Sequence, residues 1–178
     1  LISNFPPEIS FEDMHLGCFA FANKHVWTSA DDAGKELVIA NDDDFSIAAG
    51  MVIAGRGEGG LRVSPWWSHD VDGLMNVRTT DGEIACFGGR LPFYSFTGAY
   101  GLHYVKGNPI HLEVTYKPHG LNASSPATIQ YELTYQGTTD PSGAPNFDQA
   151  NPAEDPPPGL WGMLNDGAPV VFDPAVSV

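Results

Sequence analysis

Two segments near the middle of the chain alternate apolar and polar residues over eight positions each. In Ile110–Lys117 the apolar residues are Ile, Leu, Val and Tyr, and in Ile129–Gln136 they are Ile, Tyr, Leu and Tyr. Successive side chains on a β-strand point to opposite faces, so each segment buries one face and exposes the other. The link Pro118–Pro126 contains Gly and Ser and allows the chain to reverse. We therefore expect two long antiparallel strands in a half-buried sheet.

Shorter strands precede and follow this pair, separated by turn signals at spacings of roughly ten residues. The expected strands are Leu16–Asn23, Phe45–Ala54, Gly60–Trp66, Gly73–Thr79, Glu83–Phe87, Leu91–Phe96 and Leu160–Leu164. Thr28–Lys35 is predicted to be a loop, and Asn165–Gly167 a turn. No segment shows a 3.6-residue apolar period over ten residues, which disfavours helices. The pattern predicts an all-β fold, a two-sheet antiparallel β-sandwich of jelly-roll type.

The length of 178 residues fits one domain spanning 1–178. Within it we expect an extended N-terminal arm over 1–15, a long Pro-rich surface loop over 138–159, and a fraying tail over 168–178. The sequence has neither an initiator Met nor a signal-peptide pattern, so we expect a mature product or an excised piece of a longer protein.

The charge balance restricts the partners. Eight Lys and Arg face 22 Asp and Glu, which gives a net charge of −14. Such a surface repels polyphosphates and anionic lipids, so we expect no nucleic-acid partner. No apolar run reaches 18 residues, so no membrane insertion is expected. This net charge remains compatible with a neutral polymer or with calcium as a partner. Few Lys and many Asp, Gly, Thr and aromatic residues suit a secreted or extracellular protein.

Two local sequence features, a glycine-rich segment and the two cysteines, do not identify a function. Gly55–Gly60 matches the GxGxxG spacing, but a strand pattern follows it, whereas a dinucleotide site requires a helix there. We therefore interpret it as a hairpin loop. Cys18 and Cys86 are the two cysteines, and they form either one long-range disulfide or two buried thiols.

The Trp66–Trp67 pair suggests a sugar site. Adjacent strand residues face opposite sides, so one Trp reaches the polar face together with Arg62. Polar residues of the next strand share one face: Asp72, Asn76 and Arg78. An aromatic ring packs on a pyranose while planar polar groups bind its hydroxyls. The alternative is that both Trp side chains serve only in packing.

Tyr94 and Tyr100 belong to an aromatic-rich segment that includes Phe96, His103 and Tyr104. Rigid aromatic side chains suit a binding loop. They also suit a loop that caps one end of the core, which is the favoured of the two alternatives.

Catalytic motifs for nucleophilic chemistry are absent from the sequence, and the six histidines are scattered. Glycoside hydrolysis needs two carboxylates across the scissile bond. The strand carboxylates Glu83, Glu113 and Glu132 could supply such a pair only if the fold brings two of them together.

The segment from about Phe45 to Tyr135 resembles the concanavalin A-like (laminin-G-like) jelly-roll superfamily. The resemblance rests on FSIAAGMVIAG, EGGLRVSPWW, MNVRTTDGEIACF, IHLEVTYKP and ATIQYELTYQG, with LWGML and NDG following later. It implies a sandwich that binds glycans on a concave face or rim. It also implies a structural calcium held by Asp13 and Asp166. The catalytic ExDxxE strand of related β-glucanases is absent, which favours a non-catalytic module.

Three functions follow, of which non-catalytic, lectin-like carbohydrate binding leads. The second is a structural subunit of an extracellular assembly or filament, in which the N-terminal arm adds a strand to a neighbour. The third is a polysaccharide hydrolase or lyase.

Overall fold

A computed structural model describes most strands and the side chains of the central part of the chain. The described backbone covers residues 2–3, 22–30, 36–37, 40–64, 73–88, 90–147, 160–166 and 170–177. Side chains are described within 40–61, at 63, and within 73–88 and 90–147.

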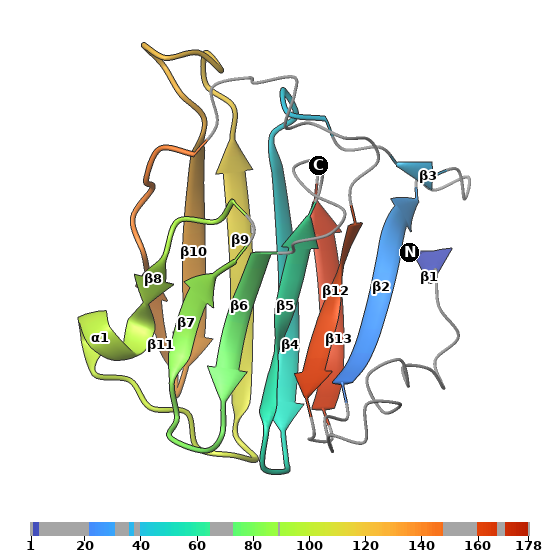
Figure 1. The fold of residues 1–178 in the computed structure, drawn as a ribbon, viewed down its shortest axis with the longest axis vertical. Coiled ribbons are helices and arrows are strands. Elements are labelled where there is room, and N and C mark those ends of the chain that lie inside the picture. The colour runs from blue at the N-terminus through green and yellow to red at the C-terminus, as the bar shows by residue number, and fades with distance from the viewer. Residues whose placement is uncertain are drawn as a thin grey trace.

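Two antiparallel sheets, one behind the other in Figure 1, form the fold. The larger sheet has the order β1 (Ile2–Ser3), β2 (Ala22–Ala30), β12 (Leu160–Asp166), β5 (Glu58–Ser64), β6 (Gly73–Arg78), β7 (Ile84–Phe87) and β8 (Tyr94–Ser95), and β3 (Glu36–Leu37) pairs with β2. The smaller sheet has the order β11 (Thr138–Pro141), β10 (Thr128–Tyr135), β9 (Pro109–Lys117), β4 (Phe45–Ile53) and β13 (Val170–Ser177). The predicted two-sheet β-sandwich is confirmed.

The alternating strand pair lies at the centre of the smaller sheet. Strands β9 and β10 are antiparallel, with Ile129 opposite Tyr116 and Tyr135 opposite Ile110. The apolar residues of both strands are at most 2% exposed, as the alternation predicts. One face of this sheet is therefore directed into the core.

The larger sheet supplies the other half of the core. Leu61 and Val63 of β5 and Met75 and Val77 of β6 are fully buried and belong to the same cluster as the inward side chains of the smaller sheet. Cys86 of β7 adds a free, buried thiol, and burial raises its pKa well above the usual range. Cys18 lies outside the described residues.

Buried tyrosines join this core to the surrounding loops through their hydroxyl groups. The Tyr131 hydroxyl donates to the Pro92 carbonyl at 2.9 Å, and the Tyr116 hydroxyl donates to the Asn41 carbonyl at 2.6 Å. Burial also raises the pKa of Tyr131. A hydroxyl that reaches a backbone carbonyl lets a large apolar ring be buried without leaving its polar end unpaired.

Three predicted loops and turns contain strand residues. Strand β2 extends through Thr28–Ala30, which was predicted to be loop, and Asn165–Asp166 continue β12 rather than forming a turn. The segment 138–159 begins with β11, because Gln136 (φ 53°) and Gly137 (φ 83°) make a two-residue reversal after β10. The rest of that segment, residues 148–159, lies outside the described residues.

Two further predictions about chain ends and short strands were wrong. The segment 168–178 was predicted to fray, but β13 within it pairs with β4 from Val170–Ile53 to Ser177–Ser46. Only Tyr94–Ser95 of the predicted strand Leu91–Phe96 is extended. Ser95 then caps the short helix α1 (Phe96–Tyr100) by accepting a hydrogen bond from Gly98 N at 2.9 Å.

The described part of the N-terminal arm pairs within its own chain. Ile2 stands opposite Thr28 and Ser3 opposite Trp27 in the β1–β2 pairing. The remainder of the predicted arm, which includes Asp13, lies outside the described residues. Among the described helices, none is long and apolar enough to cross a bilayer.

Substitution Tyr131→Phe tests the loop anchoring. It leaves the Pro92 carbonyl without its donor, so we expect the free energy of unfolding to fall by about 1 kcal/mol. Urea denaturation followed by tryptophan fluorescence measures this. Tyr100→Phe is the matched control, because its hydroxyl also donates to a carbonyl, that of Pro141, but at an exposed position. An equal loss in both variants would contradict the importance of the buried bond.

Candidate functional site

The candidate site lies on the outer face of the larger sheet, the face directed away from the core. Alternation places Leu74, Asn76 and Arg78 of β6 there, since Met75 and Val77 between them are buried in the core. The strand register sets Glu58 of β5 beside Arg78 and Gly60 beside Asn76. It also sets Ala85 beside Asn76 and Phe87 beside Leu74. The predicted common face of Asn76 and Arg78 is therefore present.

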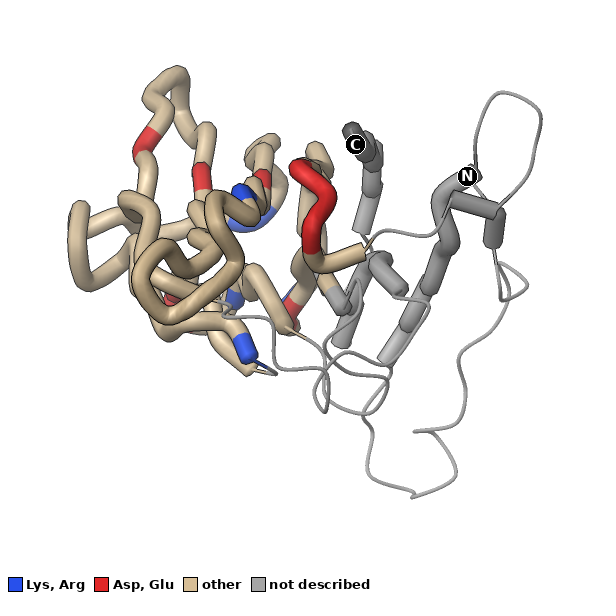
Figure 2. The backbone as a smooth tube through the Cα atoms, turned by 90° about the horizontal axis from the view of Figure 1, so that it is seen from above, with Lys and Arg blue, Asp and Glu red and all other residues tan. Residues whose placement is uncertain are grey.

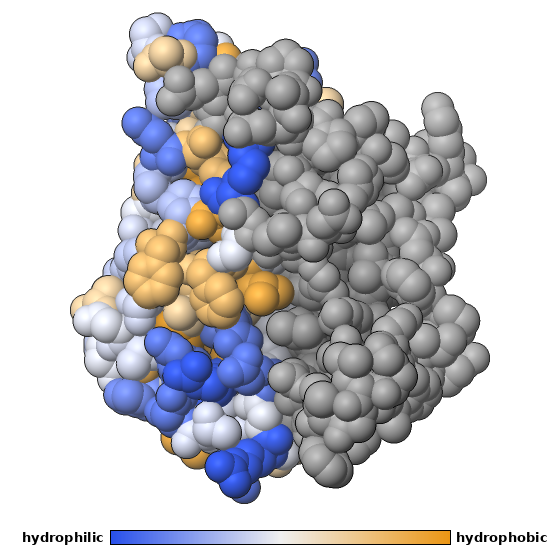
Figure 3. Space-filling view, viewed as in Figure 1, coloured by the Kyte–Doolittle hydropathy of each residue, from blue (hydrophilic) through white to orange (hydrophobic). Residues whose placement is uncertain are grey.

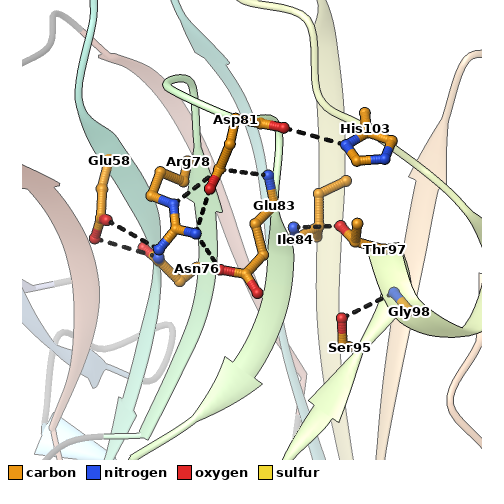
Figure 4. A network of polar contacts seen from close by, with 10 residues as sticks. All are labelled: Glu58, Asn76, Arg78, Asp81, Glu83, Ile84, Ser95, Thr97, Gly98 and His103. Atoms are coloured by element: carbon orange, nitrogen blue, oxygen red, sulfur yellow. Dashed lines mark hydrogen bonds and ion pairs between the residues drawn. The ribbon is translucent and has the colours of Figure 1, made fainter.

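Arg78 is surrounded by three carboxylates (Figure 4). Its Nε donates to Asp81 Oδ1 at 2.8 Å, and its Nη2 pairs with Asp81 Oδ2 and, at 2.6 Å, with Glu83 Oε2. Glu58 lies on the other side, with 3.9 Å between Nη1 and Oε1. The bond from Arg78 and the Glu83 amide lower the pKa of Asp81 to about 2. Asp81 and its acidic neighbours raise the pKa of Arg78 in turn.

The turn that carries Asp81 is fixed from several sides. Thr79 Oγ1 donates to a backbone carbonyl of the β4–β5 turn and accepts from Gly57 N at 2.8 Å. His103 Nδ1 lies 3.1 Å from the Asp81 carbonyl oxygen, as Figure 4 shows. Tyr104 N donates to Gly82 O at 2.8 Å. The carboxylate of Asp81 is thus held in place to orient Arg78.

Asn76 carries a buried polar atom that has no partner. Its side chain is on the outer face, yet the residue is only 4% exposed. The Nδ2 group donates to Glu58 Oε2 at 3.3 Å. The Oδ1 atom is buried and accepts no hydrogen bond. Unpaired buried acceptors are uncommon because each costs roughly 1–3 kcal/mol, so a donor that reached this atom would recover that cost.

Both cross-strand neighbours of Asn76 are small. A Cβ at Gly60 would lie 2.2 Å from the Met75 carbonyl oxygen, so only glycine allows β5 to approach β6 this closely. Ala85 on the other side contributes only a methyl group. In this cross-strand row the polar side chain of Asn76 therefore lies between a glycine and an alanine.

An apolar patch adjoins this polar row. Leu74 and Phe87 stand opposite each other on the outer face, and Phe87 is 36% exposed. Figure 3 shows apolar side chains over β6 and β7, with hydrophilic areas on either side. Phe93, which is 72% exposed, follows in the segment after β7. The outer face thus combines an exposed aromatic ring and partly exposed charged groups with the buried amide of Asn76.

The remaining predicted site residues divide into two groups. Trp66, Trp67 and Asp72 lie outside the described residues, as does Asp13, while Arg62 and Asp166 are placed by backbone only, on β5 and β12. Tyr94 and Tyr100 are not brought to Asn76. Tyr94 stands opposite the buried Cys86 and packs edge-on against Phe96, with 5.0 Å between ring centroids. Tyr94 packs against the core, whereas Tyr100 is 44% exposed and its hydroxyl donates to the Pro141 carbonyl.

The calcium prediction is not tested by the described residues. No cluster of three metal-ligating side chains occurs among them. The acidic run Asp42–Asp44 forms a continuous red stretch in Figure 2, but the carboxylates of Asp43 and Asp44 have partners within the chain. Asp43 Oδ2 accepts from Ala40 N at 2.8 Å, and Asp44 pairs with Lys117 Nζ at 2.6 Å. The proposed pair Asp13 and Asp166 remains a prediction.

A hollow lies on the opposite side of the sandwich from Asn76. It has a volume of about 630 Å³, and β4, β9 and the β10–β11 turn line it, including Gly50, His111, Thr134 and Gln136. Thr134 Oγ1 already pairs with Thr139 Oγ1 at 2.9 Å. No described side chain of this hollow has a buried polar atom that lacks a partner. The Asn76 region is therefore the stronger candidate.

Three residues of the candidate site were not predicted from the sequence: Glu58, Asp81 and Phe87. Glu58 lies in the glycine-rich segment that was interpreted as a hairpin loop, although β5 begins at this residue. Phe87 was predicted to be in a strand. Because adjacent strand residues face opposite sides, a buried Cys86 would have placed Phe87 on the outer face.

Comparisons with known proteins bear on the fold. No protein-family model matches the sequence, and no curated protein matches it significantly. Among solved structures, an alginate lyase from Pseudomonas aeruginosa aligns at 13% identity and a TM-score of 0.51, covering 87% of this chain and 74% of that one. Chicken galectin 2 aligns at 10% identity and a TM-score of 0.45, covering 79% and 96%. The similarity to the alginate lyase structure supports the jelly-roll sandwich fold that the sequence predicted.

The titration of Asp81 tests the Arg78 network. The folded-state pKa of about 2 lies below the ordinary value of 3.8, so the interaction stabilises the fold above pH 4 and is lost as the pH falls towards 2. In Arg78→Met we expect the Asp81 midpoint, measured by carboxyl NMR, to rise towards 3.8. Lys117→Met removes a cation from the other sheet and should leave this midpoint unchanged. An unchanged midpoint in Arg78→Met would refute the network.

Proposed function

We propose that this chain is a non-catalytic, lectin-like carbohydrate-binding protein, and that its site is the outer face of β5, β6 and β7. The unpartnered Oδ1 of Asn76 is the observation that carries this proposal. A sugar hydroxyl is a donor of the right kind for a buried amide oxygen. The exposed ring of Phe87 offers a surface for the apolar side of a pyranose.

The spacing of the outer face suits one sugar unit. Phe87 and Ala85 are two residues apart on β7, which corresponds to roughly 6.6 Å along the strand. Asn76 is the cross-strand neighbour of Ala85. A pyranose stacked on Phe87 would therefore lie beside the Asn76–Ala85 pair. These two residues are 4% and 3% exposed, so contact with the Asn76 amide requires the groups that cover it to move.

The state of the carboxylates favours binding over catalysis. Glycoside hydrolysis needs one carboxyl group that holds a proton near neutral pH. Asp81 has its pKa lowered to about 2, and Glu83 pairs with Arg78 at 2.6 Å. These interactions support a structural role for Asp81 and Glu83, which is to orient Arg78. The lyase and hydrolase alternatives receive no comparable support from this face.

The assembly hypothesis has less support than glycan binding. It required the arm to donate a strand to a neighbour, whereas Ile2–Ser3 pairs with β2 of the same chain. Extracellular location fits the glycan proposal and remains a prediction from composition.

Asn76→Ala tests the hydrogen bond to the ligand. Affinity electrophoresis in gels containing neutral glucan, galactan, mannan or xylan identifies a retained polymer. We expect Asn76→Ala to weaken retention about tenfold, which corresponds to one hydrogen bond of roughly 1.4 kcal/mol. Thr134→Ala, on the opposite side of the sandwich, should bind as the wild type does. Full retention of Asn76→Ala would exclude Asn76 from the site.

Phe87→Ala tests the stacking surface, and Trp66→Ala is compared with it. If a sugar ring rests on Phe87, its removal weakens binding by roughly five- to tenfold, the range expected for an aromatic contact. If only Trp66→Ala loses binding on the same polymer, the stacking surface is Trp66, as predicted from the sequence, and Phe87 has no part in it.

A further inference from the structure

We infer that the Asn76 site selects neutral saccharides and excludes sugars that carry carboxylate or sulfate groups. This inference rests on the proposed function and specifies the class of ligand. It follows from the charges beside Asn76 and from the way in which Arg78 is engaged.

Arg78 is positioned as a structural cation rather than as a receptor for anions. A guanidinium recognises a carboxylate by offering two parallel N–H groups to its oxygens. On Arg78 that pair of groups is already directed at Asp81, since Nε and Nη2 both contact its carboxylate. The Nη2 group also contacts Glu83, and Nη1 faces Glu58. A ligand carboxylate would have to displace one of these partners.

The cluster formed by Glu58, Arg78, Asp81 and Glu83 is itself negative. Three carboxylates and one guanidinium leave two net negative charges. The four side chains are 33–53% exposed, so their field reaches a ligand on the outer face. Repulsion of a ligand anion by two charges at roughly 7 Å in water weakens binding by about tenfold at low salt.

The unpartnered Oδ1 of Asn76 also restricts which group of a ligand can lie beside it. Its Oδ1 can only accept a hydrogen bond, and its Nδ2 donor is already used by Glu58 Oε2. A hydroxyl group can donate to this oxygen, whereas an ionised carboxylate or sulfate has no proton to donate. Among the described residues, the hydrogen bond therefore requires a ligand hydroxyl at Asn76, and the charges disfavour a carboxylate or sulfate beside it.

Matched polymers provide the test. A neutral β-glucan or galactan that the protein retains is compared with its C6-oxidised form, which differs only by carboxylates. We expect wild type to bind the neutral polymer at least about tenfold more tightly at 20 mM salt. Binding of the neutral polymer should not change between 20 and 500 mM NaCl. Equal or tighter binding of the oxidised polymer would overturn the inference and leave the proposed function intact, whereas failure to bind any neutral polymer in the preceding screen would count against that function.

Paired variants identify the source of the selectivity. Glu58→Gln with Glu83→Gln keeps the side-chain shapes and removes two negative charges, so binding of the oxidised polymer should rise about tenfold. Glu113→Gln with Glu132→Gln makes the same change in net charge on the other sheet, where these two residues are register partners, and should change nothing. Equal effects of both double variants, or no gain in either, would contradict the local role of the cluster. Thermal unfolding verifies that each variant is folded.

Discussion

Burial of one face of each sheet is the constraint from which the rest of the structure follows. The inward rows of β9 and β10 are apolar except for tyrosine hydroxyls. Those of Tyr116 and Tyr131 donate to backbone carbonyls of loops, and that of Tyr135 accepts from Val105 N. The inner face of the larger sheet is equally apolar through Leu61, Val63, Met75 and Val77. Because strand residues alternate, polar groups are confined to the outer faces, and the loops that join the strands are fixed by the core.

Asn76 is an exception to this pattern of satisfied polar groups. Its neighbours on the outer face satisfy one another, since Arg78 has three acidic partners and the turn at Asp81 is held by Thr79 and His103. The Oδ1 of Asn76 alone lacks a partner among the buried atoms of this described face. A rigid frame around one unmet acceptor is what a preorganised binding site requires, because little ordering is then left for the ligand to induce.

Sequence reasoning predicted the parts of this structure that depend on local alternation. It placed β4, β5, β6, β7, β9 and β10 to within a few residues, and it put Asn76 and Arg78 on one polar face. It missed features set by distant partners. Whether 138–141 or 170–177 forms a strand depends on β10 and β4 being available to pair with them. The end of the predicted strand Leu91–Phe96 was decided by the capping bond of Ser95.

The site was predictable in the same partial way. Alternation could identify which side chains share a face, but it could not show that Glu58, Asp81 and Glu83 converge on one guanidinium. That convergence depends on the register of β5 against β6 and on the turn before β7. It changes the expected role of Arg78 from a direct partner of sugar hydroxyls to a group that organises the carboxylates beside Asn76.

A crystal structure of the protein with a neutral oligosaccharide cut from a polymer that it retains is the most direct test. The account predicts the sugar on the outer face of β6 and β7, with one hydroxyl within hydrogen-bond distance of Asn76 Oδ1 and the ring over the apolar patch. Density for the sugar in the hollow beside His111 and Gln136 instead, with Asn76 Oδ1 still unpaired, would contradict it.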